Sequence, residues 1–290
     1  MPGSEIAGFL LIDKPEGITS FDVISRLRRI TGIKRIGHTG TLDPFATGLL
    51  ICCLGVYTRL AQYLEASVKS YEACLSFGTA TDSADKTGIL IKQTELPSPD
   101  ADLAALTRKA LDLSSLPVPA YSAIKIDGKR AYKYAREGAA PEMPWREVKI
   151  SSFEVLSYTP RSMIYRCTVS KGTYIRALSE WIAEELNSSG HSSELRRISI
   201  GKTSVESAIP LEDLNPHNWQ DRLYNPALLF SDFPSLQASA SEILDLHNGK
   251  QILNPGADTD QLIITNEEGA ILGVAERKAG SIRPMANFKL

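Results

Sequence analysis

Hydrophobic residues follow two strand-like patterns in the first part of the chain. Phe9–Ile12 and Leu49–Leu54 are uninterrupted apolar runs. Runs of this length are typical of buried strands, and a short buried helix gives the same pattern. The first run leads into a turn at Lys14-Pro15, which favours a strand there. Lys69–Gly78 instead alternates apolar and polar residues, which predicts a strand with one buried face.

A helical period marks three further segments. Thr19 and Asp22 have the spacing of a capping box, so we expect a helix to begin there and to end at Gly32. Two more helices are expected over residues 97–111 and 170–186. The apolar face expected for the first helix consists of Phe21, Ile24, Leu27 and Ile30.

The pattern changes towards the C-terminus. Val148–Leu156 and Met163–Val169 alternate like paired strands, and together with the helices they predict an α+β domain over residues 1–232. Beyond it, short apolar stretches such as Leu262–Ile264 are separated by turn residues. This pattern is typical of a small β barrel, so we expect a β-rich domain over residues 233–290.

Composition narrows the class of protein. The 290 residues are enough for one large domain, or for a large and a small one. No apolar run approaches the roughly 20 residues of a membrane helix. No basic region precedes the first apolar run, so we expect no signal peptide and a cytoplasmic location. The four cysteines and four histidines lack metal-ligand spacing, so we expect no metal and treat the cysteines as small buried apolar residues.

The segment Gly37–Gly48 combines three glycines, three threonines, one histidine, one proline and one carboxylate. Pro44 restricts its own φ angle and favours an extended conformation at Asp43. The segment therefore predicts a stiff loop that presents a carboxylate at the edge of a buried element. An aspartate before proline is also a common turn former, and a lone histidine is more often structural than catalytic.

This segment closely resembles the Gly-His-x-Gly-x-Leu-Asp-Pro-x-Ala-x-Gly signature of the TruB family of pseudouridine synthases. The resemblance covers roughly residues 9–201, in matching order. It implies a pseudouridine synthase fold, with a mixed, mainly antiparallel sheet flanked by helices, followed by a small PUA-like RNA-binding domain. The other segments that resemble motifs of the family are Lys14–Ser20, Lys69–Gly78, Pro119–Arg130, Lys171–Arg176 and Leu195–Arg197.

The resemblance also implies an activity and a substrate. Members isomerise uridine to pseudouridine at position 55, in the T loop of tRNA, without a cofactor. Because the target lies inside a structured loop, the base must be flipped out to reach a catalytic group. The resemblance makes Asp43 that group and Arg176 its cationic partner.

Four further residues are expected at the substrate. The resemblance implies that Tyr71 stacks on the target base, and we expect Tyr174 and Leu195 to close the pocket around it. His38 could stack in the gap that the flipped base leaves or touch the adjacent phosphate. We expect stacking, because a histidine that far from the leaving bond has no evident proton to move. As an isolated feature, a tyrosine on a strand is more often a packing residue.

Cations and tyrosines are interleaved in residues 117–138, although the whole chain has a net charge of −2. An RNA enzyme with this balance must gather its cations on one face. Cations that bind phosphate beside rings that stack on bases are typical of RNA contact. The alternative is an exposed basic helix whose tyrosines cover the core. The RNA-contact candidates are Lys125, Lys129, Arg130 and Lys133.

Two other functions compete with an isomerase. A non-catalytic tRNA-binding or RNA-folding module would use the same pocket without chemistry. A glycosidase-like hydrolase needs two working carboxylates, whereas Asp82 and Asp85 are expected in a loop unrelated to Asp43. We therefore expect an enzyme that acts as a monomer on the T arm of tRNA, with no membrane or metal partner.

Overall fold

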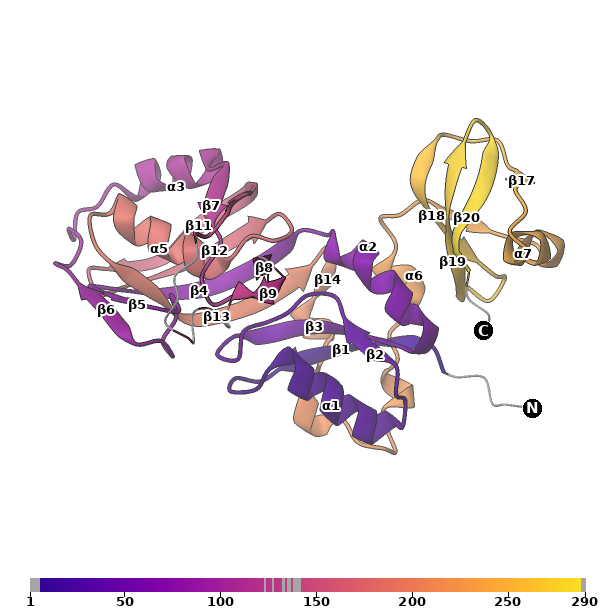
Figure 1. Cartoon of the computed structure of the whole chain (residues 1–290), viewed down its shortest axis with the longest axis horizontal. Helices are drawn as coiled ribbons and strands as arrows, with labels where there is room; N and C mark the ends of the chain where they lie inside the picture. Colours follow the sequence, from indigo (N-terminus) through magenta and orange to yellow (C-terminus); the bar gives the residue numbers. More distant parts are fainter. Residues whose placement is uncertain are drawn as a thin grey trace.

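A mixed sheet of nine strands forms the body of the protein (Figure 1). The computed structural model describes residues 6–122, 124–126, 128–131, 134, 137 and 142–287. The main strand order is β11-β12-β4-β13-β3-β1-β15, with β14 beside β13 and β2 beside β3. Within this sheet only the β13–β3 and β1–β15 pairs are parallel, which confirms the expected mixed, mainly antiparallel sheet. The strands are β1 (Gly8–Lys14), β2 (Ile36–His38), β3 (Thr47–Leu54), β4 (Lys69–Phe77), β11 (Ile150–Thr159), β12 (Ser162–Val169), β13 (Gly190–Ile200), β14 (Thr203–Ser204) and β15 (Ile209–Pro210).

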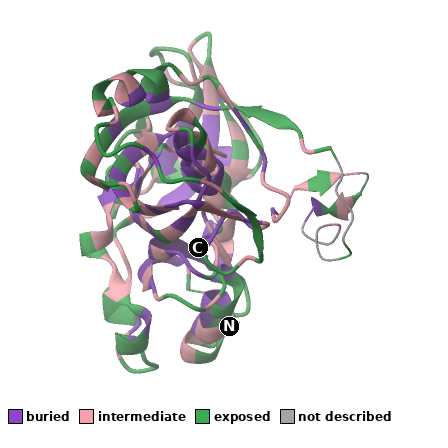
Figure 2. Ribbon diagram, turned by 90° about the vertical axis from the view of Figure 1, so that its left-hand side faces the viewer, coloured by how far each residue is buried: buried purple, intermediate pink, exposed green. Residues whose placement is uncertain are grey.

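The two uninterrupted apolar runs form the adjacent strands β1 and β3, which are buried on both faces. Side chains of β1 alternate between two cores: Phe9 and Leu11 enter one, and Leu10 and Ile12 enter the other. Strand β4 alternates buried and half-buried residues instead, as its sequence predicts. Figure 2 shows the same distribution, with buried residues in the interior and exposed ones around it.

Helices cover the two ends of the sheet. Helix α1 (Ser20–Thr31) packs on β1 and β3, and it has the expected capping box at Thr19 and a left-handed cap at Gly32. Its predicted apolar face is wrong at Phe21, which is 64% exposed. The buried stripe runs instead through Val23, Ile24 and Leu27, and the Phe21 ring lies 5.8 Å from the Arg28 guanidinium.

At the other end, α5 (Ile175–Glu185) shares a core with β4, β11 and β12, and α3 (Leu103–Asp112) lies beside it (Figure 1). Shorter elements connect these parts. They are η1 (Gly55–Leu60), α2 (Ala61–Glu65), β5 (Thr79–Thr81), β6 (Leu90–Gln93), β7 (Ser115–Pro117), β8 (Lys125–Ile126), β9 (Lys129–Arg130), β10 (Trp145–Glu147), η2 (Val205–Ser207), η3 (Leu211–Asp213), η4 (Gln220–Arg222) and α6 (Pro226–Leu229).

A second sheet of five strands occupies the C-terminal region, in the order β16-β18-β19-β20-β17. It curls around its own apolar core, as expected for a PUA-like domain. It also packs on the main body, where the Ile271 amide donates a 3.0 Å hydrogen bond to the Tyr57 hydroxyl. The domain boundary at residue 233 stays a prediction. The elements are β16 (Ser235–Gln237), α7 (Ala240–His247), β17 (Ile252–Leu253), β18 (Thr259–Thr265), β19 (Ile271–Lys278) and β20 (Ser281–Asn287).

Candidate active site

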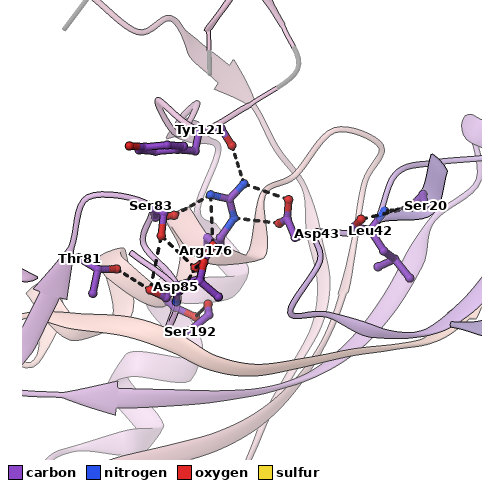
Figure 3. Close-up of polar contacts among 11 residues, drawn as sticks. Ser20, Leu42, Asp43, Thr81, Ser83, Asp85, Tyr121, Arg176 and Ser192 are labelled. Atoms are coloured by element: carbon purple, nitrogen blue, oxygen red, sulfur yellow. Dashed lines mark hydrogen bonds and ion pairs between the residues drawn. The ribbon is translucent and has the colours of Figure 1, made fainter. Parts of the chain in front are cut away.

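Asp43 lies in the loop between β2 and β3, and the segment before α1 braces this loop. Ser20 Oγ accepts from the Leu42 amide at 2.9 Å and lies 3.1 Å from the Leu42 carbonyl (Figure 3). The Gly17 amide donates to the Pro44 carbonyl at 2.8 Å. Bonds on both sides of Asp43 thus fix the backbone that presents its carboxylate.

Lys14 adds a buried cation behind the same loop. Its ammonium donates to the carbonyls of Pro15 at 2.8 Å, Ile18 at 2.7 Å and Pro44 at 3.4 Å. An ammonium has three protons to donate, so these three acceptors saturate it. Burial lowers the pKa of Lys14 to about 8, and the nearby Asp43 carboxylate opposes that shift. The geometry indicates that Lys14 holds the loop and is not available to a ligand.

Arg176, the second residue of α5, forms the expected pair with Asp43. Its Nε donates to Asp43 Oδ2 at 2.9 Å, and its Nη2 lies 3.4 Å from Asp43 Oδ1. The guanidinium is 3% exposed and also donates to two backbone carbonyls, Ser83 at 2.6 Å and Tyr121 at 2.8 Å (Figure 3). A planar guanidinium bound on several sides holds both the position and the charge of the carboxylate.

Asp85 belongs to the same cluster, so its expected placement in an unrelated loop is wrong. Its Oδ2 lies 3.8 Å from Arg176 Nη1. Ala84 has a φ of 59°, a left-handed conformation that is rare outside glycine. This turn directs the Ser83 carbonyl and the Asp85 carboxylate towards one guanidinium. Asp85 is 5% exposed and accepts from Ser83 and Thr87, so it does not supply the accessible second carboxylate that a hydrolase needs.

Asp43 itself remains accessible, with a third of its side chain exposed. Burial raises the pKa of Asp43 above its ordinary value, and the Asp85 carboxylate adds to the rise. Arg176 acts in the opposite direction, through its charge and its hydrogen bonds, and Lys14 does so more weakly. The carboxylate is therefore poised between two opposing effects: desolvation favours its neutral form, and the guanidinium favours its charged form.

A cavity of about 470 Å³ opens over this pair, and most of the expected substrate residues line it. Its wall includes Asp43, Arg176, Tyr71, Tyr174 and Leu195, which come from a loop and from three elements of the fold or their ends. Tyr71 and Leu195 are buried in the adjacent core. The structure thus brings five of the six residues expected at the base into one site.

His38 is the exception among the six, because it does not belong to the cavity wall that the described residues form. It lies half-buried in β2, where its Nδ1 is 3.3 Å from the Gly40 amide. Burial, with Arg197 as a second cause, lowers the pKa of His38 below its ordinary value. A neutral ring suits stacking better than contact with a phosphate.

The candidates Lys125, Lys129 and Arg130 lie on the β8–β9 hairpin and do not line the cavity. Lys125 and Arg130 are exposed. Lys129 forms an ion pair with Glu137, and its ammonium lies 4.6 Å from the centroid of the Tyr134 ring. Lys133 lies outside the described residues.

Three buried cations at the site were missed as site residues in the sequence, namely Lys14, Lys69 and Arg197. Lys69 and Arg197 line the cavity, and Lys14 lies behind it. Each belongs to a segment that resembles a motif of the family. Their burial depends on tertiary packing, however, which no local pattern reveals.

Two further findings concern classes of site. In the ranges that the structure describes, no group of three or more His, Cys, Asp or Glu residues is placed to hold a metal ion. Within the same ranges, no helix is both long enough and apolar enough to span a membrane.

Known proteins resemble this chain in sequence and in fold. A model of the TruB family pseudouridylate synthases (N-terminal domain) matches residues 28–175. The chain is 35% identical over 298 residues to tRNA pseudouridine synthase B of Gluconacetobacter diazotrophicus, and the alignment covers 97% of both chains. It is also 35% identical over 304 residues to tRNA pseudouridine synthase B of Cupriavidus metallidurans, covering 100% of this chain and 96% of the relative.

Solved structures share the fold at lower identity. A chain in the structure of an H/ACA RNP bound to a substrate RNA containing 2'-deoxyuridine superposes with a TM-score of 0.71 at 20% identity. The superposition covers 98% of this chain and 85% of that chain. Both the large sheet and the C-terminal sheet therefore belong to a known architecture.

Proposed function

Because this chain belongs to the TruB family of pseudouridylate synthases, we propose that it isomerises uridine to pseudouridine at position 55, in the T loop of tRNA. The curated relatives that match it over nearly their whole length bear the name tRNA pseudouridine synthase B. One observation of the structure carries the proposal: a partly exposed carboxylate, held by a buried guanidinium, faces a cavity lined by an aromatic ring.

The reaction needs a single carboxylate and no redox partner. Uracil is detached from C1′ of its ribose at N1, turned, and rejoined through C5; the proton lost from C5 balances the proton gained at N1. Asp43 can attack C1′ or C6, or it can abstract a sugar proton to give a glycal. Each route requires an ionised Asp43, and the contacts of Arg176 with both carboxylate oxygens favour that form.

The target uridine enters the cavity by base flipping. Flipping costs a few kcal/mol, which stacking on aromatic side chains can offset. Tyr71 supplies the stacking surface beside Asp43, and Tyr174 and Leu195 enclose the base. A volume of about 470 Å³ lies within the range of small-molecule sites. His38 then stacks on the neighbours of the flipped base, outside the cavity.

The test is pseudouridine formation in an unmodified tRNA transcript, read at single-nucleotide resolution. Wild type is compared with Asp43→Asn, which keeps the shape of the side chain but not its charge. Asp245→Asn is the matched control, because that carboxylate pairs with Lys250 on the C-terminal sheet domain. We expect product at position 55 with wild type and the control, no detectable turnover with Asp43→Asn, and tRNA affinities within about tenfold of each other.

Other outcomes point elsewhere. A folded wild type that binds tRNA and forms no pseudouridine would support the non-catalytic binding module. Product from Asp43→Asn would retain the enzyme and reject Asp43 as the catalytic residue.

A further inference from the structure

A second group of charges lines the cavity without taking part in the proposed chemistry. Lys69, Lys171 and Arg197 share the wall with Glu65, an acid in addition to Asp43. Arg197 is 1% exposed and Lys69 is 7% exposed. None of the three cations lies within ion-pair distance of an acidic side chain among the residues that the structure describes. Lysine and arginine are almost never buried unless they are paired, so these two require an explanation.

The hydrogen bonds of the two buried cations leave donors unused. The Lys69 ammonium donates to the carbonyls of Glu65 at 2.9 Å and Ser67 at 2.8 Å, which leaves one of its three protons. Arg197 donates from Nε to the Leu49 carbonyl at 2.7 Å and from Nη2 to the Gly40 carbonyl at 3.1 Å. No acceptor among the described residues lies against its Nη1. The Lys14 ammonium, by contrast, donates all three of its protons to carbonyls.

The side chains of Lys69 and Arg197 both approach the backbone of Gly40. A methyl group built on Gly40 would lie 3.6 Å from Lys69 Cε and 3.7 Å from Arg197 Nη1. Next to it, Thr39 is fully buried and lines the cavity, and its hydroxyl has no hydrogen-bond partner among the described residues. An orphaned buried hydroxyl is costly and indicates a partner that the chain does not supply.

We propose that Thr39, Lys69 and Arg197 form a subsite for a phosphodiester group of the RNA, next to the flipped nucleotide. This inference rests on the proposed function. A phosphate oxygen accepts from ammonium, guanidinium and hydroxyl groups alike, and it supplies the negative charge that the two buried cations lack. The exposed Lys171 at the same wall adds attraction, and Glu65 only partly cancels it.

The electrostatics of Lys69 agree with such a ligand. Burial, and after it the charge of Arg197, lower the pKa of Lys69 to about 8; Glu65 opposes this shift and Lys171 adds to it. A phosphate bound there favours the charged form of Lys69. The charged form of Lys69 is therefore poorly stabilised by the protein alone and would be well stabilised by a bound RNA phosphate.

The experiment removes charge from each side of the contact. The RNA is a short T-arm stem-loop, used unmodified or with one neutral methylphosphonate at each linkage flanking the target uridine. The proteins are wild type, Lys69→Gln and Lys69→Arg. Lys109→Gln is the matched control, because Lys109 is exposed on α3 and pairs with Glu185. Binding is measured as Kd over a range of salt concentrations.

We expect one neutral linkage to weaken wild-type binding by about tenfold. The same linkage then costs Lys69→Gln little more, because the contact is already lost. Lys69→Gln also reduces the slope of log K against log salt by about 0.7 to 0.9, whereas Lys69→Arg and Lys109→Gln keep it.

Two results would overturn the subsite. One is that no neutral linkage weakens the wild type, which decides the matter even if Lys69→Gln does not fold. The other is that a neutral linkage weakens the binding of Lys69→Gln as much as it weakens the binding of wild type. If the subsite binds a free phosphate ion and not the RNA backbone, the neutral linkages also have no effect on Kd. Pseudouridine formation in the unmodified stem-loop is followed in parallel. Its absence would contradict the proposed function, and its presence without the coupling would contradict the subsite alone.

Discussion

The cavity contains two groups of buried charges that differ in how fully the protein itself satisfies them. Around Asp43, the Arg176 guanidinium contacts both carboxylate oxygens and two backbone carbonyls. Around Gly40, Lys69 and Arg197 bond only to carbonyls and retain spare donors. The first group is complete before any ligand arrives, and the second is not.

This difference separates two tasks. A group held rigidly by its own neighbours costs little reorganisation when it acts on a substrate, which suits chemistry. A charge without an internal partner gains more from an ionic ligand, which suits binding. The two groups can also be perturbed separately. The charged neighbours of Asp43 are Arg176, Asp85 and Lys14, whereas those of Lys69 are Arg197, Glu65 and Lys171.

The largest effect is expected from Arg176→Lys, which disrupts the group around Asp43, whose hydrogen bonds the protein itself satisfies. One ammonium cannot replace a planar guanidinium that reaches Asp43, Ser83 and Tyr121 together. We expect the single-turnover rate to fall by about 100-fold while Kd for tRNA stays within about threefold. An unchanged rate, or a loss confined to Kd, would mean that Arg176 does not position the reacting carboxylate.

The pH dependence of the rate tests the same group. Asp43 is required in its ionised form, so the rate should fall on the acid side, by about tenfold per pH unit below its pKa. Because burial raises the pKa of Asp43 above its ordinary value, this fall should begin at a higher pH than for an exposed aspartate. Arg176→Lys should move it higher still. The measurement is the single-turnover rate with saturating enzyme; a flat profile down to about pH 4 would contradict it.

For the second group, Lys69 and Arg197, we expect the affinity for RNA to change at alkaline pH. Lys69 binds phosphate in its protonated form, so affinity should decline as pH rises through about 8, by up to about tenfold. The charged groups that face Lys69 are Arg197, Glu65 and Lys171. Lys69→Arg should abolish the decline. A decline of equal size in Lys69→Arg would assign it to another group, such as Lys14, whose pKa is also about 8.

The sequence predicts these two groups unequally well, for physical reasons. The strands β1 and β4 and the capped helix α1 follow from local patterns, because periodicity and capping involve neighbouring residues. The Asp43–Arg176 pair joins residues 133 positions apart, so only the family resemblance indicated it. Neither the local sequence patterns nor the family resemblance predicted the position of Asp85. Its position beside Arg176 depends on the left-handed turn at Ala84, and alanine carries no local signal for that conformation.

The smallest expected effects lie outside the cavity, on the β8–β9 hairpin, where the same contrast recurs on the surface. Lys125 is exposed and forms no ion pair with the described residues, whereas Lys129 is paired with Glu137. We expect Lys125→Ala to weaken RNA binding by about threefold and to lower the salt slope by up to about 1. Lys129→Ala should cost less, because Lys129 must first leave its carboxylate.

Glu137→Gln provides the opposite perturbation of this pair. Removing the competing carboxylate should tighten RNA binding by about twofold, since exposed ion pairs contribute only 0 to about 1 kcal/mol. The measurement is Kd at low and high salt, because an electrostatic gain fades as salt increases. If Glu137→Gln weakens binding instead, the pair with Lys129 serves to hold the hairpin for RNA. In that case a cation that is paired within the protein also contributes to RNA binding. The division found in the cavity, where paired charges suit chemistry and unpaired cations suit binding, would then not apply to the surface.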